Sequence, residues 1–158
     1  MLEILPRWLV ILLISMLPIV ELRGAIPVAL GAYNMNPWIV FPVAVIGNMI
    51  PVPFILLFFG YAEKYLRKYK SFDRFFNRLF EKTRKRADMK IKRYETLGLL
   101  AFVAVPLPFT GAWTGALIAY LFGLKFWKSI LTIFMGVIVA GFIVTAVCIT
   151  GKAFWFLI

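Results

Sequence analysis

An acid and a base, Glu21 and Arg23, stand two residues apart after a run of thirteen uncharged residues, and Gly24 follows them. An ionisable side chain at membrane depth costs about 2.5–3.5 kcal/mol on insertion scales, so such residues persist where they face protein or water. Side chains two apart on a regular helix do not face each other, so a direct pair requires a chain break, which Gly24 permits. We predict a substrate- or proton-binding site here; an ordinary interfacial loop is the alternative.

A second interruption lies far along the chain, where Pro106, Pro108 and Gly111 disfavour a continuous helix. The half-helix after each break directs its N-terminus at the break, and its N–H groups attract anions. We expect Thr110 to cap the second half-helix, with Thr114 one turn further on; simple capping is the competing role for both threonines.

The two breaks together predict the chemistry of the site. Converging N-termini and Arg23 would suit a phosphate or a carboxylate, with Glu21 as the proton-binding group. Pro27 belongs to the same candidate set. Asn48 is polar within an apolar segment, and either lines the pathway or forms a helix–helix hydrogen bond.

Composition places this site in a membrane. Of the 158 residues, 63% are apolar and 16% are charged, whereas soluble domains are about 45–50% apolar and about 25% charged. The chain has no His and one Cys, Cys148, so we expect no metal site and no cofactor. No nucleotide-binding glycine pattern or Ser/His/Asp set occurs, and we expect no enzyme activity.

Four uncharged blocks supply the elements that must position these residues: 8–20, 30–61, 96–124 and 129–151. A spanning helix needs about 20 apolar residues, which the fourth block and residues 37–60 provide. The first block is too short, and the third is broken in its middle. Both are expected to form a half-helix, a break and a second half-helix.

The two broken segments resemble each other. Residues 24–33 match residues 111–120 at six of ten positions, and with two residues inserted Trp38 then aligns with Trp127 and Gly47 with Gly136. Five of the six matches are Gly, Ala or Leu, so chance similarity is the alternative. The predicted fold is all-α and integral to the membrane, one domain over 1–158. Each inverted repeat, 8–60 and 96–151, is a re-entrant hairpin followed by a transmembrane helix.

The linker between the repeats, 61–95, carries thirteen Lys or Arg against five Asp or Glu, out of a total charge of +11. Short basic loops are cytoplasmic, which orients a multi-pass protein of the cell membrane. An amphipathic helix is expected near 71–80. The basic strip either contacts anionic lipid headgroups or only enforces topology, and nucleic-acid binding is not expected. Its candidate contact residues are Arg84, Lys85, Arg86, Lys90, Lys92 and Arg93.

Residues 17–27, LPIVELRGAIP, and 105–115, VPLPFTGAWTG, resemble the prokaryotic putative small multi-drug export protein family. That family resembles, more distantly, the DedA superfamily, whose members have paired re-entrant hairpins and include proton-linked lipid-carrier translocases. The resemblance implies a transporter. In DedA proteins acidic and arginine residues occur in both halves, whereas residues 97–124 here carry no charge.

These observations predict a small transporter or flippase, proton-coupled through Glu21, for an anionic or amphipathic small molecule or lipid. Membrane lipids and that substrate are the expected partners. Four membrane elements are few to enclose a pathway, so a homodimer is also expected. The alternative function is a non-transporting scaffold or assembly factor that binds anionic lipid through its basic linker.

Overall fold

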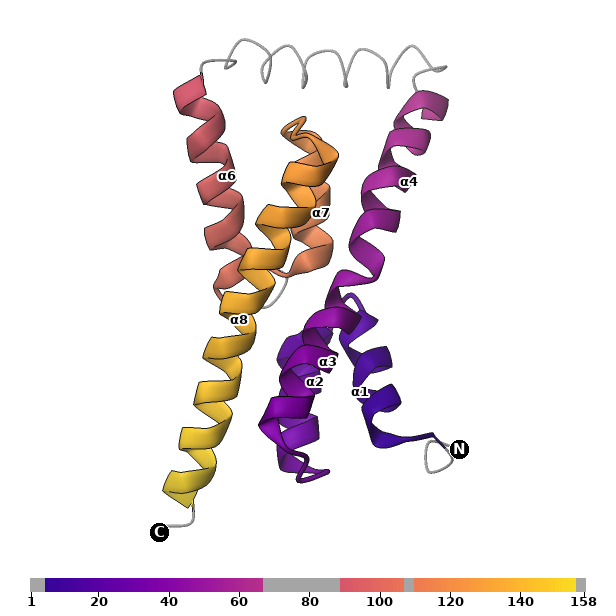
Figure 1. Ribbon diagram of the computed structural model, residues 1–158. Helices are drawn as coiled ribbons and strands as arrows, with labels where there is room; N and C mark the ends of the chain where they lie inside the picture. The colour runs from indigo at the N-terminus through magenta and orange to yellow at the C-terminus, as the bar shows by residue number, and fades with distance from the viewer. Residues whose placement is uncertain (1–4, 67–88, 107–109, 156–158) are drawn as a thin grey trace.

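The computed structural model describes residues 5–66, 89–106 and 110–155, and within these residues every regular element is an α-helix, as predicted. The helices pack around an apolar core to which most of them contribute. Figure 1 shows them in chain order: α1 (Arg7–Met16), α2 (Glu21–Gly31), α3 (Pro37–Met49), α4 (Pro51–Leu66), α6 (Met89–Ala104), α7 (Ala112–Leu121) and α8 (Phe126–Trp155).

Four short helices form two pairs. α1 and α2, the first helix pair, extend from one end of the molecule to its middle, and α6 and α7, the second helix pair, extend from the opposite end (Figure 1). The ends of the connections within the pairs, residues 17–20 in the first and residues 105–106 and 110–111 in the second, therefore lie near mid-height. The first and third uncharged blocks are both broken, as the sequence predicts. Their re-entry into a membrane and their inverted relation stay predictions.

The first break lies earlier than expected. Residues 17–20 form the connection and α2 begins at Glu21, so the prediction of a break from Glu21 to Gly24 was wrong. Pro18 explains the position, because its ring removes a backbone N–H and disfavours a helical residue before it. Leu17 is accordingly extended, with φ −72° and ψ 136°.

The predicted helix over 37–60 forms a stretch from Pro37 to Tyr61, divided into α3 and α4 at Ile50. The division falls immediately before Pro51, which has no N–H to donate. The α3 N-terminus is capped by Asn36, whose side chain accepts the backbone N–H of Trp38 at 3.0 Å.

Two stretches are long and apolar enough to cross a membrane: Pro37–Tyr61, with 25 residues, and Phe126–Gly151, with 26. At about 1.5 Å per residue each exceeds the roughly 30 Å of bilayer hydrocarbon. Both lengths allow a complete crossing with some tilt.

Glycines bring the short helices against the long ones. A Cβ at Gly47 of α3 would lie 2.6 Å from the Leu12 carbonyl oxygen of α1. A Cβ at Gly136 of α8 would lie 2.7 Å from Cβ of Val103 on α6. Only glycine allows such approach, so the two residues aligned in the sequence each hold a short helix against a long one.

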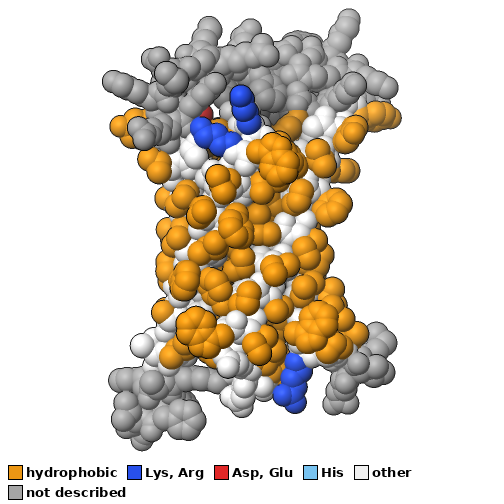
Figure 2. Space-filling view, viewed as in Figure 1, with side chains coloured by type: hydrophobic (Ala, Val, Ile, Leu, Met, Phe, Trp, Pro, Cys, Tyr) orange, Lys and Arg blue, Asp and Glu red, His pale blue; other side chains and the backbone are white. Residues whose placement is uncertain are grey.

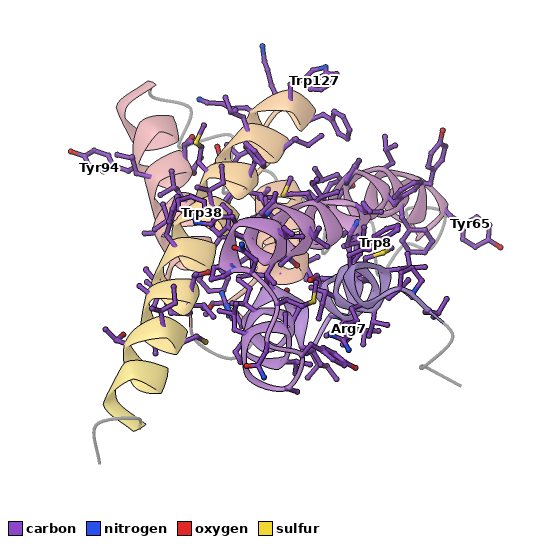
Figure 3. The ribbon with its side chains drawn as sticks, turned by 60° about the horizontal axis from the view of Figure 1, so that its bottom comes forward. Arg7, Trp8, Trp38, Tyr65, Tyr94 and Trp127 are labelled. Atoms are coloured by element: carbon purple, nitrogen blue, oxygen red, sulfur yellow. The ribbon has the colours of Figure 1, made fainter. Side chains whose placement is uncertain are left out.

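Aromatic and charged side chains gather at the two ends. Trp38 is 86% exposed where α3 begins, and Trp127 is 78% exposed where α8 begins. Figure 2 shows apolar side chains over the middle of the visible face, with Lys and Arg toward its ends. In Figure 3 Tyr65, Tyr94 and Trp127 point outward. Exposed aromatics bordering an apolar band are typical of membrane interfaces.

The predicted basic linker lies mostly outside the described residues. This applies to the expected amphipathic helix near 71–80 and to Arg84, Lys85 and Arg86. Lys90, Lys92 and Arg93 fall within α6, but their side chains are also outside the description. Their contact with lipid headgroups stays a prediction.

Candidate functional site

The carboxylate of Glu21 lies at the N-terminus of α7. Its Oε1 accepts the backbone N–H of Trp113 at 3.5 Å, and the backbone N–H of Ala112 also reaches the carboxylate. The N-cap residue of α7 is Gly111, which has no side chain to offer these groups. Glu21, from the other helix pair, therefore satisfies the open end of α7 and its positive dipole.

Glu21 holds this position at a conformational cost. Its φ is +51°, in the left-handed region, and its side chain is only 5% exposed. A non-glycine residue there costs about 1–3 kcal/mol and persists where its surroundings enforce it. The backbone of Glu21 thus turns its side chain out of α2 and into the second helix pair.

Gly111 makes room for the carboxylate. A Cβ added at Gly111 would overlap both oxygens of Glu21. The expectation that Thr110 caps α7 was wrong, because the Thr110 hydroxyl donates to the Val105 carbonyl at 2.8 Å instead. Thr110 closes the connection, and the capping of α7 comes from Glu21.

Arg23 binds backbone carbonyls at the end of α6 and in the connection that follows it. Its Nη2 lies 3.3 Å from the Val103 carbonyl oxygen, 3.1 Å from that of Val105 and 3.0 Å from that of Thr110. The first of these carbonyls belongs to the last turn of α6, where a helix carries negative partial charge. Glu21 and Arg23 thus engage oppositely charged ends of the second helix pair.

Asn48 joins the site from α3. It is 1% exposed, and its side chain forms a hydrogen bond with Glu21. Its Oδ1 has no hydrogen-bond partner within the part of the chain that the structure describes. Asn48 lies on α3, and the Glu21 carboxylate that it contacts comes from α2 and binds the N-terminus of α7. This hydrogen bond therefore connects α3 with both helix pairs.

Trp113 was not singled out from the sequence. Its indole N–H donates to the Met16 carbonyl at 3.1 Å, and Met16 ends α1. α7 therefore caps α1 while α2 caps α7, and the two pairs are interlocked. The sequence did contain a signal for this role, because Trp113 is a tryptophan with a polar N–H directly after a predicted break.

A cavity of about 350 Å³ opens beside these contacts. Of the predicted site residues, five line it and three more contact its lining; the remaining two are Pro27, exposed on α2 outside the lining, and Pro108, outside the described residues. The five are Glu21, Arg23, Gly24, Pro106 and Thr114, and the three are Asn48, Thr110 and Gly111.

No group of three or more His, Cys, Asp or Glu residues that could hold a metal ion occurs among the residues the structure describes. The polar groups of the site are one carboxylate, one guanidinium, an amide, hydroxyls and the backbone of a helix end. Such groups can exchange a proton and form hydrogen bonds with a polar ligand.

The match to a known family covers this site and most of the fold. No curated protein and no solved structure matches the chain. The family model described as "Putative small multi-drug export protein" matches residues 21–143, from Glu21 into α8. The match does not extend to the DedA superfamily, and that more distant resemblance stays a prediction. The match to the family model and the two long apolar helices together indicate a membrane protein. The chain belongs to the putative small multi-drug export protein family.

Proposed function

We propose that the protein is a small multi-pass transporter or flippase of the cell membrane, with the junction of the two helix pairs as its transport site. One observation carries the proposal: a buried acid and a base, Glu21 and Arg23, hold the open helix ends where two broken segments meet at mid-height. In transporters, discontinuous helices with such ends form the substrate and ion sites near the bilayer centre.

Charge supports a role for Glu21 in coupling. As a carboxylate it is attracted by the dipole of α7 and by Arg23. Protonation removes the charge and occupies one oxygen with a proton. The α7 N-terminus is then open to a polar group of the substrate, and the two helix pairs are less firmly joined.

The site also changes the expectation for the substrate. The N-terminus of α7, assigned from the sequence to an anionic ligand, is occupied by the protein's own carboxylate. An external anion would have to compete with Glu21, so its binding would depend on protonation. We therefore propose an amphipathic substrate whose polar group replaces Glu21, rather than a permanently bound anion.

The remaining features are part of the same proposal. The two helix pairs would be re-entrant hairpins of inverted repeats, the basic linker would lie in the cytoplasm, and no chemical reaction would be catalysed. The scaffold alternative depends on the basic linker, most of which lies outside the described residues. The interlocked acid and base favour transport.

Reconstitution into liposomes tests the proposal. Uptake of a panel of amphipathic dyes and labelled lipids would be measured with and without a pH gradient. We expect gradient-dependent movement that Glu21→Gln and Arg23→Ala abolish. Glu95→Gln and Arg7→Ala are matched controls outside the site and should leave transport unchanged. Transport that survives both site substitutions would refute the assignment.

A further inference from the structure

An apolar groove lies between α4 and α7. Its volume is about 530 Å³, within the range of sites for small ligands. Phe54 and Phe58 form its outer edge and are 69% and 67% exposed. The groove therefore opens to the outside between the two helices, within the apolar part of the molecular surface. Its other apolar residues are Ile55, Phe59, Trp113 and Leu117.

The inner end of the groove reaches the charged site. Thr114 lines the groove and also lines the cavity that holds Glu21 and Arg23. Trp113 lines the groove too, while its backbone N–H contacts Glu21. A molecule in the groove would thus have aromatic and aliphatic walls along most of its length and polar groups at one end.

The two helices that form the groove extend from the middle of the molecule to one end (Figure 1). That end carries the exposed Tyr61 and Lys125. A second cavity, of about 410 Å³, lies further along the same helices and includes Tyr61 and Tyr120 in its lining. The two cavities share no lining residue, so the groove and the second cavity are separate hollows beside α4 and α7.

We propose that the groove between α4 and α7 is a lateral entry site for an amphiphile, with its hydrocarbon or aromatic part between the helices and its polar head at Thr114. The inference rests on the proposed function and deepens it by stating the route by which the amphipathic substrate enters and where its head first lies. Glu21 and Arg23 are both engaged by the protein itself. The head therefore meets nearly neutral surroundings, and the site selects for amphipathic shape more than for the sign of the head's charge.

Photo-crosslinking in lipid nanodiscs tests the proposal without any gradient. The probe is a hexadecyl chain that carries a diazirine and a hydroxyl head, and its adducts are mapped by mass spectrometry. Leu117→Trp fills the groove and should lower labelling of residues 54–59 and 113–117 about fivefold, which corresponds to about 1 kcal/mol. Val147→Trp, on the exposed part of α8 and 64% exposed in the wild type, is the matched control and should have no effect.

Two further variants distinguish a bound amphiphile from other molecules that could occupy the groove. Phe58→Ala removes the outer wall without overpacking and should also lower labelling, which keeps the test valid if Leu117→Trp does not fold. Thr114→Val should weaken labelling by the hydroxyl probe but not by the same chain without a head. Equal labelling in wild type, Leu117→Trp and Phe58→Ala would mean ordinary bilayer lipid and overturn the proposal, as would crosslinks to a second copy through the groove.

The outcome can be separated from that of the proposed function. Groove-specific labelling in a protein that moves no amphiphile in liposomes would support the entry site and contradict transport. Transport that requires Glu21 but is unaffected by Leu117→Trp and Phe58→Ala would support the proposed function and overturn the lateral route.

Discussion

Glu21 of α2 accepts the backbone N–H of Trp113 at the start of α7, while the indole of the same tryptophan donates to the last carbonyl of α1. Each helix pair thus completes a helix end of the other. Open helix ends in hydrocarbon cost several kcal/mol for each unsatisfied group. The interlock therefore allows two broken segments to meet inside an apolar protein.

Gly111→Ala should break this relationship by sterics alone. The added methyl group would occupy the position of the Glu21 carboxylate, which must then leave the end of α7. We expect the stability to fall by about 2–4 kcal/mol, measured by thermal unfolding in detergent. Gly98→Ala on α6 is the control, because no atom lies within 4 Å of its added Cβ; it should be neutral or stabilising by up to about 1 kcal/mol. Equal stability of the two variants would contradict the packing described.

Trp113→Phe tests the other half of the interlock. The ring is retained but the Met16 carbonyl loses its donor, and we expect a loss of about 1–2 kcal/mol in thermal unfolding. Trp127→Phe changes an exposed tryptophan at the start of α8 and should change stability by less than about 0.5 kcal/mol. A smaller effect at position 113 than at 127 would show that the indole bond contributes nothing.

Arg23→Lys should be a poor replacement. A guanidinium presents five donors in a planar fork, whereas an ammonium is a compact charge with three. All three carbonyls lie around the terminal Nη2 of Arg23, and the ammonium of the shorter lysine side chain ends one bond nearer the backbone, so we expect Lys to lower stability by about 1–2 kcal/mol and to reduce transport. Arg7→Lys, at the exposed start of α1, is the matched control. Full activity and stability in Arg23→Lys would mean that charge alone suffices.

Asn48→Leu should separate function from stability. The change removes the hydrogen bond to Glu21 but also removes a buried acceptor without a partner among the described residues, and these effects of about 1–2 kcal/mol each oppose one another. We expect a nearly unchanged unfolding temperature and a large loss of transport. Thr145→Val, which also removes a buried oxygen with no partner in the described residues, should leave transport intact. Parallel losses of stability and activity in Asn48→Leu would favour a purely structural bond.

Much of this architecture could be predicted from the sequence because its signals are local. Prolines placed the break before α7, and uncharged length placed α8. Grouping Glu21 and Arg23 with Thr110 and Gly111 followed from the two breaks. What could not be read is which group satisfies which helix end. That depends on the turned backbone of Glu21 and on contacts over about ninety residues of chain, such as Trp113 with Glu21. Capping by Thr110 would have been a local contact, whereas α7 is capped by Glu21, which is distant in the sequence.

The orientation of the two ends gives the last prediction. Arg7 and Lys125 lie at opposite ends of the molecule, at the start of α1 and just before α8 (Figure 1). If the long helices cross the bilayer and the basic linker is cytoplasmic, a membrane-impermeant maleimide added outside cells should label Arg7→Cys but not Lys125→Cys. Cys148→Ala removes the one native thiol and provides the background. Permeabilised cells should show labelling at both positions, which controls for reactivity. Labelling of Lys125→Cys from outside would reverse the topology, and labelling of both positions from one side would mean that the molecule does not span the membrane.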